Sequence, residues 1–192
     1  MQLAKFLLAL VVLTVACGDE ETATFEDNQT LLAALDNESV LMGVEINDGE
    51  ITGYVCGDEA RFQTFSRWYS GTLTDPDSFR VEADGWALEG RIEDDNRIIT
   101  MIDPNGVELT GTLNVLGAGE TGGVFENNDF DCRSGAIAMP LNGAVQVQGA
   151  LCSQPGVFAT QITPVRAFSG VVESFEAQAA GVDDPFLMER VR

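Results

Sequence analysis

The chain contains no histidine, and its basic residues are scarce. Ten Lys and Arg residues stand against 31 Asp and Glu residues, so the formal net charge at pH 7 is −21. Without an imidazole, neither a Ser-His-Asp nor a Cys-His catalytic site can be built within this chain. The usual catalytic zinc sites lose their ligands for the same reason. Chemistry based on paired carboxylates and calcium sites with oxygen ligands both remain open.

The shortage of cations also restricts the partners. Lys5 is the single lysine, so removal of residues 1–16 would leave nine arginines against 31 carboxylates, a side-chain charge of 9 − 31 = −22. Such a field repels nucleic acid and anionic headgroups, whose binding requires clustered cations. We therefore expect no nucleic-acid partner. We find no pattern that requires a cofactor, and we expect none.

The N-terminus carries a short hydrophobic run. Lys5 precedes the apolar segment Phe6–Val15, which is interrupted by Thr14 alone. A helix that spans a bilayer needs about twenty apolar residues, so this run is too short to cross as a stable helix. Its length and flanks are those of a secretory signal peptide, here residues 1–16.

The end of that segment, LTVAC at positions 13–17, resembles the lipobox of bacterial lipoproteins, with Thr14 where the family prefers an aliphatic residue. The resemblance implies cleavage before Cys17, a lipid on Cys17 and a membrane partner through that anchor. Gly18 occupies the position where Asp retains such proteins at the inner membrane. The implied location is therefore the outer membrane of the bacterial cell envelope, on its periplasmic face or at the surface. Ordinary signal-peptide cleavage remains the alternative.

The remainder divides into an acidic tether over residues 17–30 and a single β-rich domain over residues 31–192. From Val40 onward, apolar and polar residues alternate with a period of two, as between Trp86 and Ile92, which is typical of antiparallel strands with one dry face. Asx-Gly pairs and similar polar turns separate the runs, as hairpins require. The sequence predicts an all-β fold of about ten strands, a meander that curls into a small barrel or sandwich. Short helices are expected near residues 30–37, 174–180 and 185–192.

An apolar-x-Gly-x-apolar unit recurs through these strands. Its glycines are Gly53, Gly71, Gly90, Gly111, Gly149 and Gly170. Each lies on the apolar side of its predicted strand, where glycine weakens the strand unless curvature or close packing needs it. The pattern favours a strongly curved sheet over coincidence.

Three cysteines lie beyond the N-terminus. If residues 141–143 form a three-residue hairpin loop, Pro140 faces Ala144 and, counting outward, Cys132 faces Cys152. Opposed residues lie within the range of a disulfide, and an exported protein meets an oxidising compartment. We therefore predict a Cys132–Cys152 disulfide. Cys56 is left over, and we interpret it as a quiet, partly buried thiol.

The segment RFQTFSRWY, residues 61–69, combines two arginines and four aromatic rings without an acid. Arg61, Arg67 and Trp68 are the candidate ligand-binding residues, since outward aromatic rings beside arginine can stack on a sugar or bind a carboxylate or phosphate. The structural alternative is a strand that buries Trp68 and pairs Arg67 with a neighbouring Glu. No metal ligands are assigned.

The segment 146–165 resembles stretches of uncharacterised exported bacterial proteins, which adds nothing on activity. The leading hypothesis is a non-catalytic envelope module that binds a partner protein or small ligand. The alternatives are a carboxylate-dependent hydrolase of envelope glycans and a structural spacer. A deep pocket with two carboxylates, one with a raised pKa, would favour the hydrolase.

Overall fold

The computed structural model describes residues 23–130, 132–168 and 170–192, which are almost entirely β-structure. Residues 1–22, with the predicted signal peptide and Cys17, lie outside the described residues. The elements in chain order are β1 (Gln29–Leu35), β2 (Val40–Asn47), β3 (Glu50–Gly57), α1 (Phe62–Phe65), β4 (Arg67–Thr72), β5 (Ser78–Ala83), β6 (Trp86–Glu93), β7 (Asn96–Ile102), β8 (Glu108–Val115), β9 (Gly123–Asn127), β10 (Ser134–Leu141), β11 (Ala144–Gln154), β12 (Val157–Pro164), β13 (Ser174–Ala179) and β14 (Phe186–Arg190).

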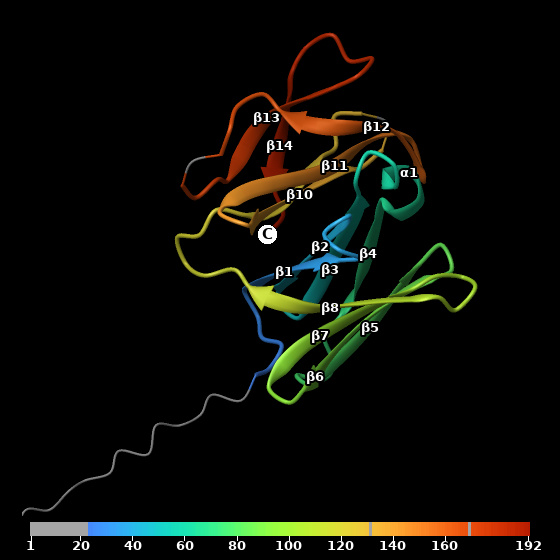
Figure 1. Cartoon of the computed structure of the whole chain (residues 1–192), viewed down its shortest axis with the longest axis vertical. Helices are drawn as coiled ribbons and strands as arrows, with labels where there is room; N and C mark the ends of the chain where they lie inside the picture. Colours follow the sequence, from blue (N-terminus) through green and yellow to red (C-terminus); the bar gives the residue numbers. More distant parts are fainter. Residues whose placement is uncertain (1–22, 131, 169) are drawn as a thin grey trace, which may run out of the picture.

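The strands form two antiparallel units, an eight-stranded sheet with the order β4-β3-β2-β1-β8-β7-β6-β5 and a closed six-stranded barrel with the order β10-β11-β12-β13-β14-β9. In Figure 1 the barrel lies above the sheet. The all-β prediction is confirmed, with fourteen strands in the described chain rather than about ten. Of the two predicted alternatives the barrel is found, because one unit closes into a barrel, and the other unit is a curled sheet packed against it.

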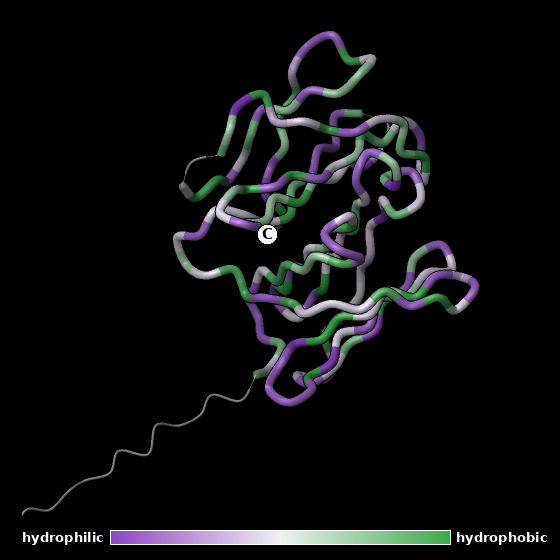
Figure 2. The backbone as a smooth tube through the Cα atoms, in the orientation of Figure 1, coloured by the Kyte–Doolittle hydropathy of each residue, from purple (hydrophilic) through white to green (hydrophobic). Residues whose placement is uncertain are grey.

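The polar turns predicted from the sequence occupy the hairpin ends. Asp48-Gly49, Asp84-Gly85 and Asn142-Gly143 each join paired strands and have positive φ at both residues. Such turns match the twist of antiparallel strands. Figure 2 shows hydrophilic residues gathered in these peripheral connections and hydrophobic residues along the strands.

The sheet curls around its own hydrophobic core. Inward residues of successive strands, among them Leu31, Met42, Leu88 and Ile99, are fully buried in one cluster. The edge strands β4 and β5 approach one another, since a Cβ on Gly71 would lie 2.5 Å from Val81 Cγ1. The sheet is thus a nearly closed cylinder filled by side chains.

The glycine repeat contributes to this curvature. A Cβ at Gly90 would lie 2.2 Å from Phe79 Cε1, and one at Gly111 would lie 2.4 Å from Leu35 Cδ2. The inward face at these positions therefore has no room for a side chain, as the facing of the repeat predicts. Gly170 and Gly53 are the exceptions, because Gly170 lies outside the strands with a φ of +71° and a Cβ at Gly53 would meet only ordinary contacts.

Strands β1, β2 and β3 are buried on both faces. Their outward residues, including Leu32, Leu41 and Tyr54, form a second cluster with Val124 and Ile137 of the barrel. A third cluster, which includes Phe125, Ile162 and Met188, fills the barrel itself. The two β units therefore share one buried layer.

The predicted terminal helices are wrong. Residues 30–37 fall in β1 and the turn after it, and the C-terminal segments form β13 and β14. The run TLLAALDN is apolar on both sides because β1 is buried on both faces, and such a run does not distinguish a helix from a buried strand. In β13, Ala177 and Ala179 are buried while Glu176 and Gln178 are exposed, an alternation that supports a strand.

The packed chain also begins earlier than the predicted tether boundary at residue 30. Phe25 is 2% exposed and stands edge-on to Phe79 at 5.0 Å between ring centroids. Its N–H donates to Pro76 O at 2.7 Å, and Asp27 Oδ1 accepts from Gly49 N at 2.6 Å. Residues 23–28 are therefore fastened to one end of the sheet.

The close approach at Gly90 predicts a selective effect of substitution. Gly90→Ala should lower the free energy of unfolding by about 1–3 kcal/mol, because the new methyl group overpacks against Phe79. Gly53→Ala is the matched control, since its Cβ would meet only ordinary contacts, the nearest at 3.4 Å. Urea unfolding of both variants measures the difference. Equal losses would show that the absence of a side chain at Gly90 does not serve close packing.

Candidate functional site

The basic and aromatic segment 61–69 lies where one end of the sheet meets the barrel. α1 and the start of β4 belong to this segment, and α1 packs against β3, β11 and β12 (Figure 1). Arg61 precedes the helix and forms an ion pair with Asp36, and its NH1 donates to Ser39 Oγ at 2.7 Å. The segment borders two cavities, one on either side.

The first cavity, here called the mouth cleft, lies at the end of the sheet formed by the turns around residues 36–39, 58–66, 84–85 and 103–107. Its volume is about 610 Å³. Its lining consists of Asp36, Arg61, Thr64, Phe65, Trp86, Met101, Asp103, Pro104, Asn105, Val107 and Leu109. Apolar side chains make the walls, and the three charged residues stand among them.

Aromatic side chains that pack against one another form one wall of the mouth cleft. Phe65 stands edge-on to Trp86, with 5.6 Å between ring centroids. The Arg67 guanidinium lies 4.1 Å from the centroid of the Trp86 ring, a cation–π contact. On the rim, the N–H groups of Val107 and Asn105 donate to Asp103 Oδ1 at 2.8 Å each and hold the pKa of this carboxyl below its usual value.

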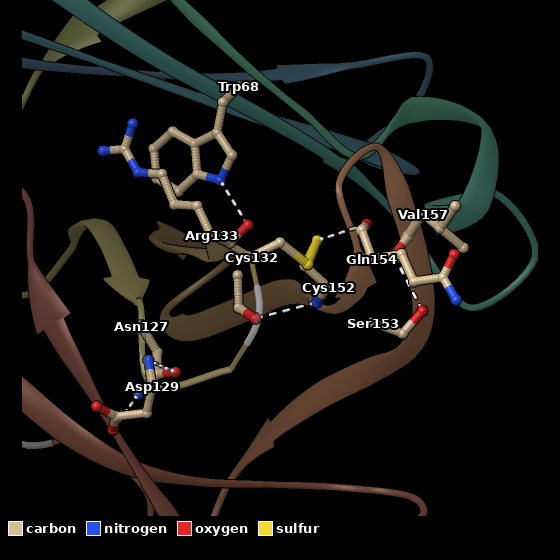
Figure 3. The surroundings of a disulfide bond; sticks show 10 residues. Trp68, Asn127, Asp129, Cys132, Arg133, Cys152, Ser153, Gln154 and Val157 are labelled. Atoms are coloured by element: carbon tan, nitrogen blue, oxygen red, sulfur yellow. Dashed lines mark hydrogen bonds between the residues drawn. A yellow bond between two sulfur atoms is a disulfide. The ribbon is translucent and has the colours of Figure 1, made fainter.

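The second cavity, here called the junction pocket, lies between the sheet and the barrel and has a volume of about 300 Å³. Its lining consists of Gln63, Ser66, Arg67, Trp68, Asp84, Cys132, Arg133, Cys152, Pro155, Gly156 and Phe158. The Arg133 guanidinium lies 3.6 Å from the Trp68 ring centroid, and Trp68 Nε1–H donates to Arg133 O at 3.3 Å. Figure 3 shows this pair beside the disulfide.

The predicted pair Cys132 and Cys152 forms this disulfide, with Cα atoms 5.7 Å apart. The predicted register is wrong by one residue, however. Leu141 pairs with Ala144, so the loop is the two-residue turn Asn142-Gly143. Cys132 lies outside β10, which begins at Ser134, and the bridge forms from an irregular segment rather than from opposed strand positions.

Cys56 is a free thiol on the face of β3 opposite Val55, and it is fully buried rather than partly buried as expected. Its Sγ lies 3.2 Å from Ser66 Oγ. Burial raises the pKa of this thiol to about 12, so the thiolate needed for nucleophilic chemistry is scarce at neutral pH.

One carboxyl group is buried where the sheet faces the barrel. Glu45 of β2 is 4% exposed; its Oε2 accepts from Thr30 Oγ1 at 2.6 Å, while Oε1 is buried without a partner among the described residues. Arg190 of β14 donates to Thr30 Oγ1 at 3.0 Å. Burial raises the pKa of Glu45 to about 7, against the opposing effects of Thr30 and Arg190.

The structure brings two of the three predicted ligand-binding residues together. Arg67 and Trp68 line the junction pocket, whereas Arg61 belongs to the mouth cleft. The alternative expected an Arg67–Glu pair and a buried Trp68. Among the described residues no such pair occurs, and Trp68 is half-buried. Sequence reasoning missed Trp86 and Arg133. Trp86 stood in a recognised strand, but no local signal placed Arg133 beside Trp68.

Glu45, the carboxyl group whose pKa burial raises, lines neither cavity. Within residues 23–130, 132–168 and 170–192, we find no group of three or more acidic or thiol side chains placed to hold a metal ion. The helical structure in these same ranges is too short to cross a bilayer. Comparisons with protein-family models, curated proteins and solved structures find no match.

The raised pKa of Glu45 predicts a pH-dependent stability. Its folded-state pKa of about 7 exceeds the ordinary glutamate value of 4.5, so the folded protein binds this proton more tightly than the unfolded chain does. The free energy of unfolding should therefore fall as pH rises from about 4.5 to about 7, by on the order of 3 kcal/mol from this group. In Glu45→Gln, the free energy of unfolding should not show this fall, so at pH 8 the variant should be more stable than the wild type.

Glu176→Gln, at an exposed glutamate of β13, is the matched control and should leave the pH profile unchanged. Urea unfolding between pH 4.5 and 8 provides the comparison. Parallel profiles of the wild type and Glu45→Gln would contradict the raised pKa.

Proposed function

We propose that this protein is a lipid-anchored envelope module that binds a small, largely apolar ligand in the mouth cleft without transforming it. The observation that carries this proposal is the cleft itself, with a volume of about 610 Å³ and walls of Phe65, Trp86, Met101 and Leu109. Ligand pockets of roughly 300–1,000 Å³ are typically lined by hydrophobic and aromatic residues with a few polar groups.

Side chains fill the interior of the curled sheet, and they limit how far a ligand can enter from the mouth cleft. Met101 is 1% exposed, and Leu88 and Ile99 behind the cleft belong to the packed core. A long acyl chain would have to displace this core, which interiors packed to crystal density resist. A compact ligand, such as an aromatic or short aliphatic molecule, fits the mouth without entering the cylinder.

The charges on the cleft favour a neutral or cationic ligand. Arg61 is paired with Asp36, and Asp103 adds a further carboxylate held by backbone N–H groups. The whole chain carries a net charge of −21, which repels anions. An anionic amphiphile is therefore the less suitable occupant.

The mouth cleft lies at the end of the sheet opposite the described N-terminal residues, which suits a protein anchored through its N-terminus. Phe25 and Asp27 are bonded to the turns at Pro76 and Gly49, whereas the cleft is lined from the opposite turns at Asp36, Arg61 and Asp103. A membrane attached through the N-terminus would therefore lie beyond the end of the sheet away from the cleft. This arrangement supports a ligand that arrives from the aqueous side.

Binding can be tested with the uncharged fluorescent probe N-phenyl-1-naphthylamine. The wild type should bind it saturably, and Leu109→Asp should weaken binding by more than about tenfold, because an unpaired carboxylate in an apolar wall is costly to bury. Leu187→Asp, at an exposed leucine of the barrel, is the matched control and should bind as the wild type. Folding of each variant is checked by circular dichroism. Absence of saturable binding, or full binding by folded Leu109→Asp, would contradict the proposal and favour a spacer.

The anchor is tested separately in bacterial cells. Cys17→Ser should release the protein from the membrane fraction and abolish incorporation of labelled fatty acid, because lipid attachment requires the thiol. Cys56→Ser, which alters the buried cysteine of β3, should remain in the membrane fraction. Membrane retention of Cys17→Ser would exclude lipid attachment at this position.

A further inference from the structure

A long stretch of the sequence contains no acidic residue. No Asp or Glu lies between Asp131 and Glu173, although the chain has 31 of them among its 192 residues. This stretch supplies β10, β11 and β12, which are neighbouring strands of the barrel. Fixed negative charges repel anions, and salt screens that repulsion beyond about 10 Å. An anion therefore meets less repulsion over these three strands than the net charge of −21 suggests.

The strand register opens a groove in this part of the barrel. β11 begins at Ala144, but its pairing with β12 starts at Ala150, which faces Gln161. Beyond Gln161, residues 162–164 of β12 pair with β13. The first half of β11 and the end of β12 therefore separate, and a groove, here called the barrel groove, lies between them. The connection from β12 to β13 borders it, at the left of the barrel in Figure 1.

Apolar side chains from both strands line the barrel groove, which has a volume of about 420 Å³. Val145, Val147 and Phe168 of this lining also pack against the hydrophobic core of the barrel. All three are half-buried, so the groove exposes one end of that core to solvent. Its size and its apolar walls are those of a small-molecule site.

Arg166 is the single charged residue in this lining, and it is exposed. Every other arginine of the chain forms an ion pair or donates a side-chain hydrogen bond, whereas no described residue bonds to the side chain of Arg166. Glu176 lines a neighbouring hollow on the other side of Phe168, and no carboxylate lines the barrel groove itself. An accessible guanidinium thus stands beside an apolar groove.

We propose that the barrel groove binds an anionic amphiphile with one aliphatic chain, which lies against Val145 and Phe168 while its carboxylate pairs with Arg166. Guanidinium groups donate strong paired hydrogen bonds to carboxylates, and removal of an aliphatic chain from water is favourable. The charge of the lining separates the two cavities, because the mouth cleft contains the carboxylates of Asp36 and Asp103. This site stands whether or not the mouth cleft binds a ligand.

The charged contact is tested with decanoate at pH 7, below the concentration at which it forms micelles, by isothermal titration calorimetry of the full chain. The wild type should bind decanoate saturably, and Arg166→Gln should weaken the Kd at least tenfold, because the carboxylate loses its cationic partner. Arg80→Gln, at an exposed arginine of β5, removes the same charge elsewhere and should keep the wild-type Kd. Absence of saturable binding, or equal Kd values for the two variants, would overturn the proposal.

The apolar contact is tested with a second pair of variants, whose folding is checked by circular dichroism. Val165→Asp places a carboxylate in the barrel groove and should abolish decanoate binding, whereas Val115→Asp in β8 should retain it; the two valines are 39% and 42% exposed. Leu109→Asp, which alters the mouth cleft, should also retain decanoate binding. Retained binding in folded Val165→Asp, or lost binding in folded Leu109→Asp, would contradict a site in the barrel groove.

Discussion

The structure depends on the burial of β1, β2 and β3 on both faces. Leu31 and Met42 point into the curled sheet, while Leu32 and Leu41, their neighbours in sequence, pack against the barrel. Three strands thus contribute to two hydrophobic clusters at once, so the sheet and the barrel stabilise each other through one shared layer. Since burial of apolar surface is the dominant favourable contribution to folding, neither unit can lose this layer without a large cost.

The shared layer also determines where polar groups must find partners. Gln148 of β11 accepts from Leu41 N at 3.0 Å and donates to Glu38 O at 3.2 Å, so one side chain bridges the two units. Glu45 is only partly satisfied there, with one oxygen bonded to Thr30 and the other without a partner. A buried carboxyl in this position favours its protonated form, which links the stability of the layer to pH.

Both candidate cavities arise where this packing ends. The segment 61–69 separates them, with Arg67 lining the junction pocket and covering Trp86, which lines the mouth cleft. The composition of the segment indicates Arg67 and Trp68 as candidate site residues, because a cluster of basic and aromatic residues is unusual in so acidic a chain. Trp86 and Arg133 come from distant parts of the sequence, and no local pattern could indicate that they meet this segment.

The sequence by itself determined the strand-rich class, the polar hairpin turns, the inward facing of Gly53 and Gly90, and the pairing of Cys132 with Cys152. These features depend on residue alternation and turn chemistry, which are local. Tertiary structure alone decided that residues 30–35 form a strand and that fourteen strands divide into a sheet and a barrel. It also decided the register of the last hairpin, which differs by one residue from the register that the disulfide prediction assumed. The physical reason is that alternation reports which face of a strand is dry, and a strand that is dry on both faces carries no such signal until its second partner is known.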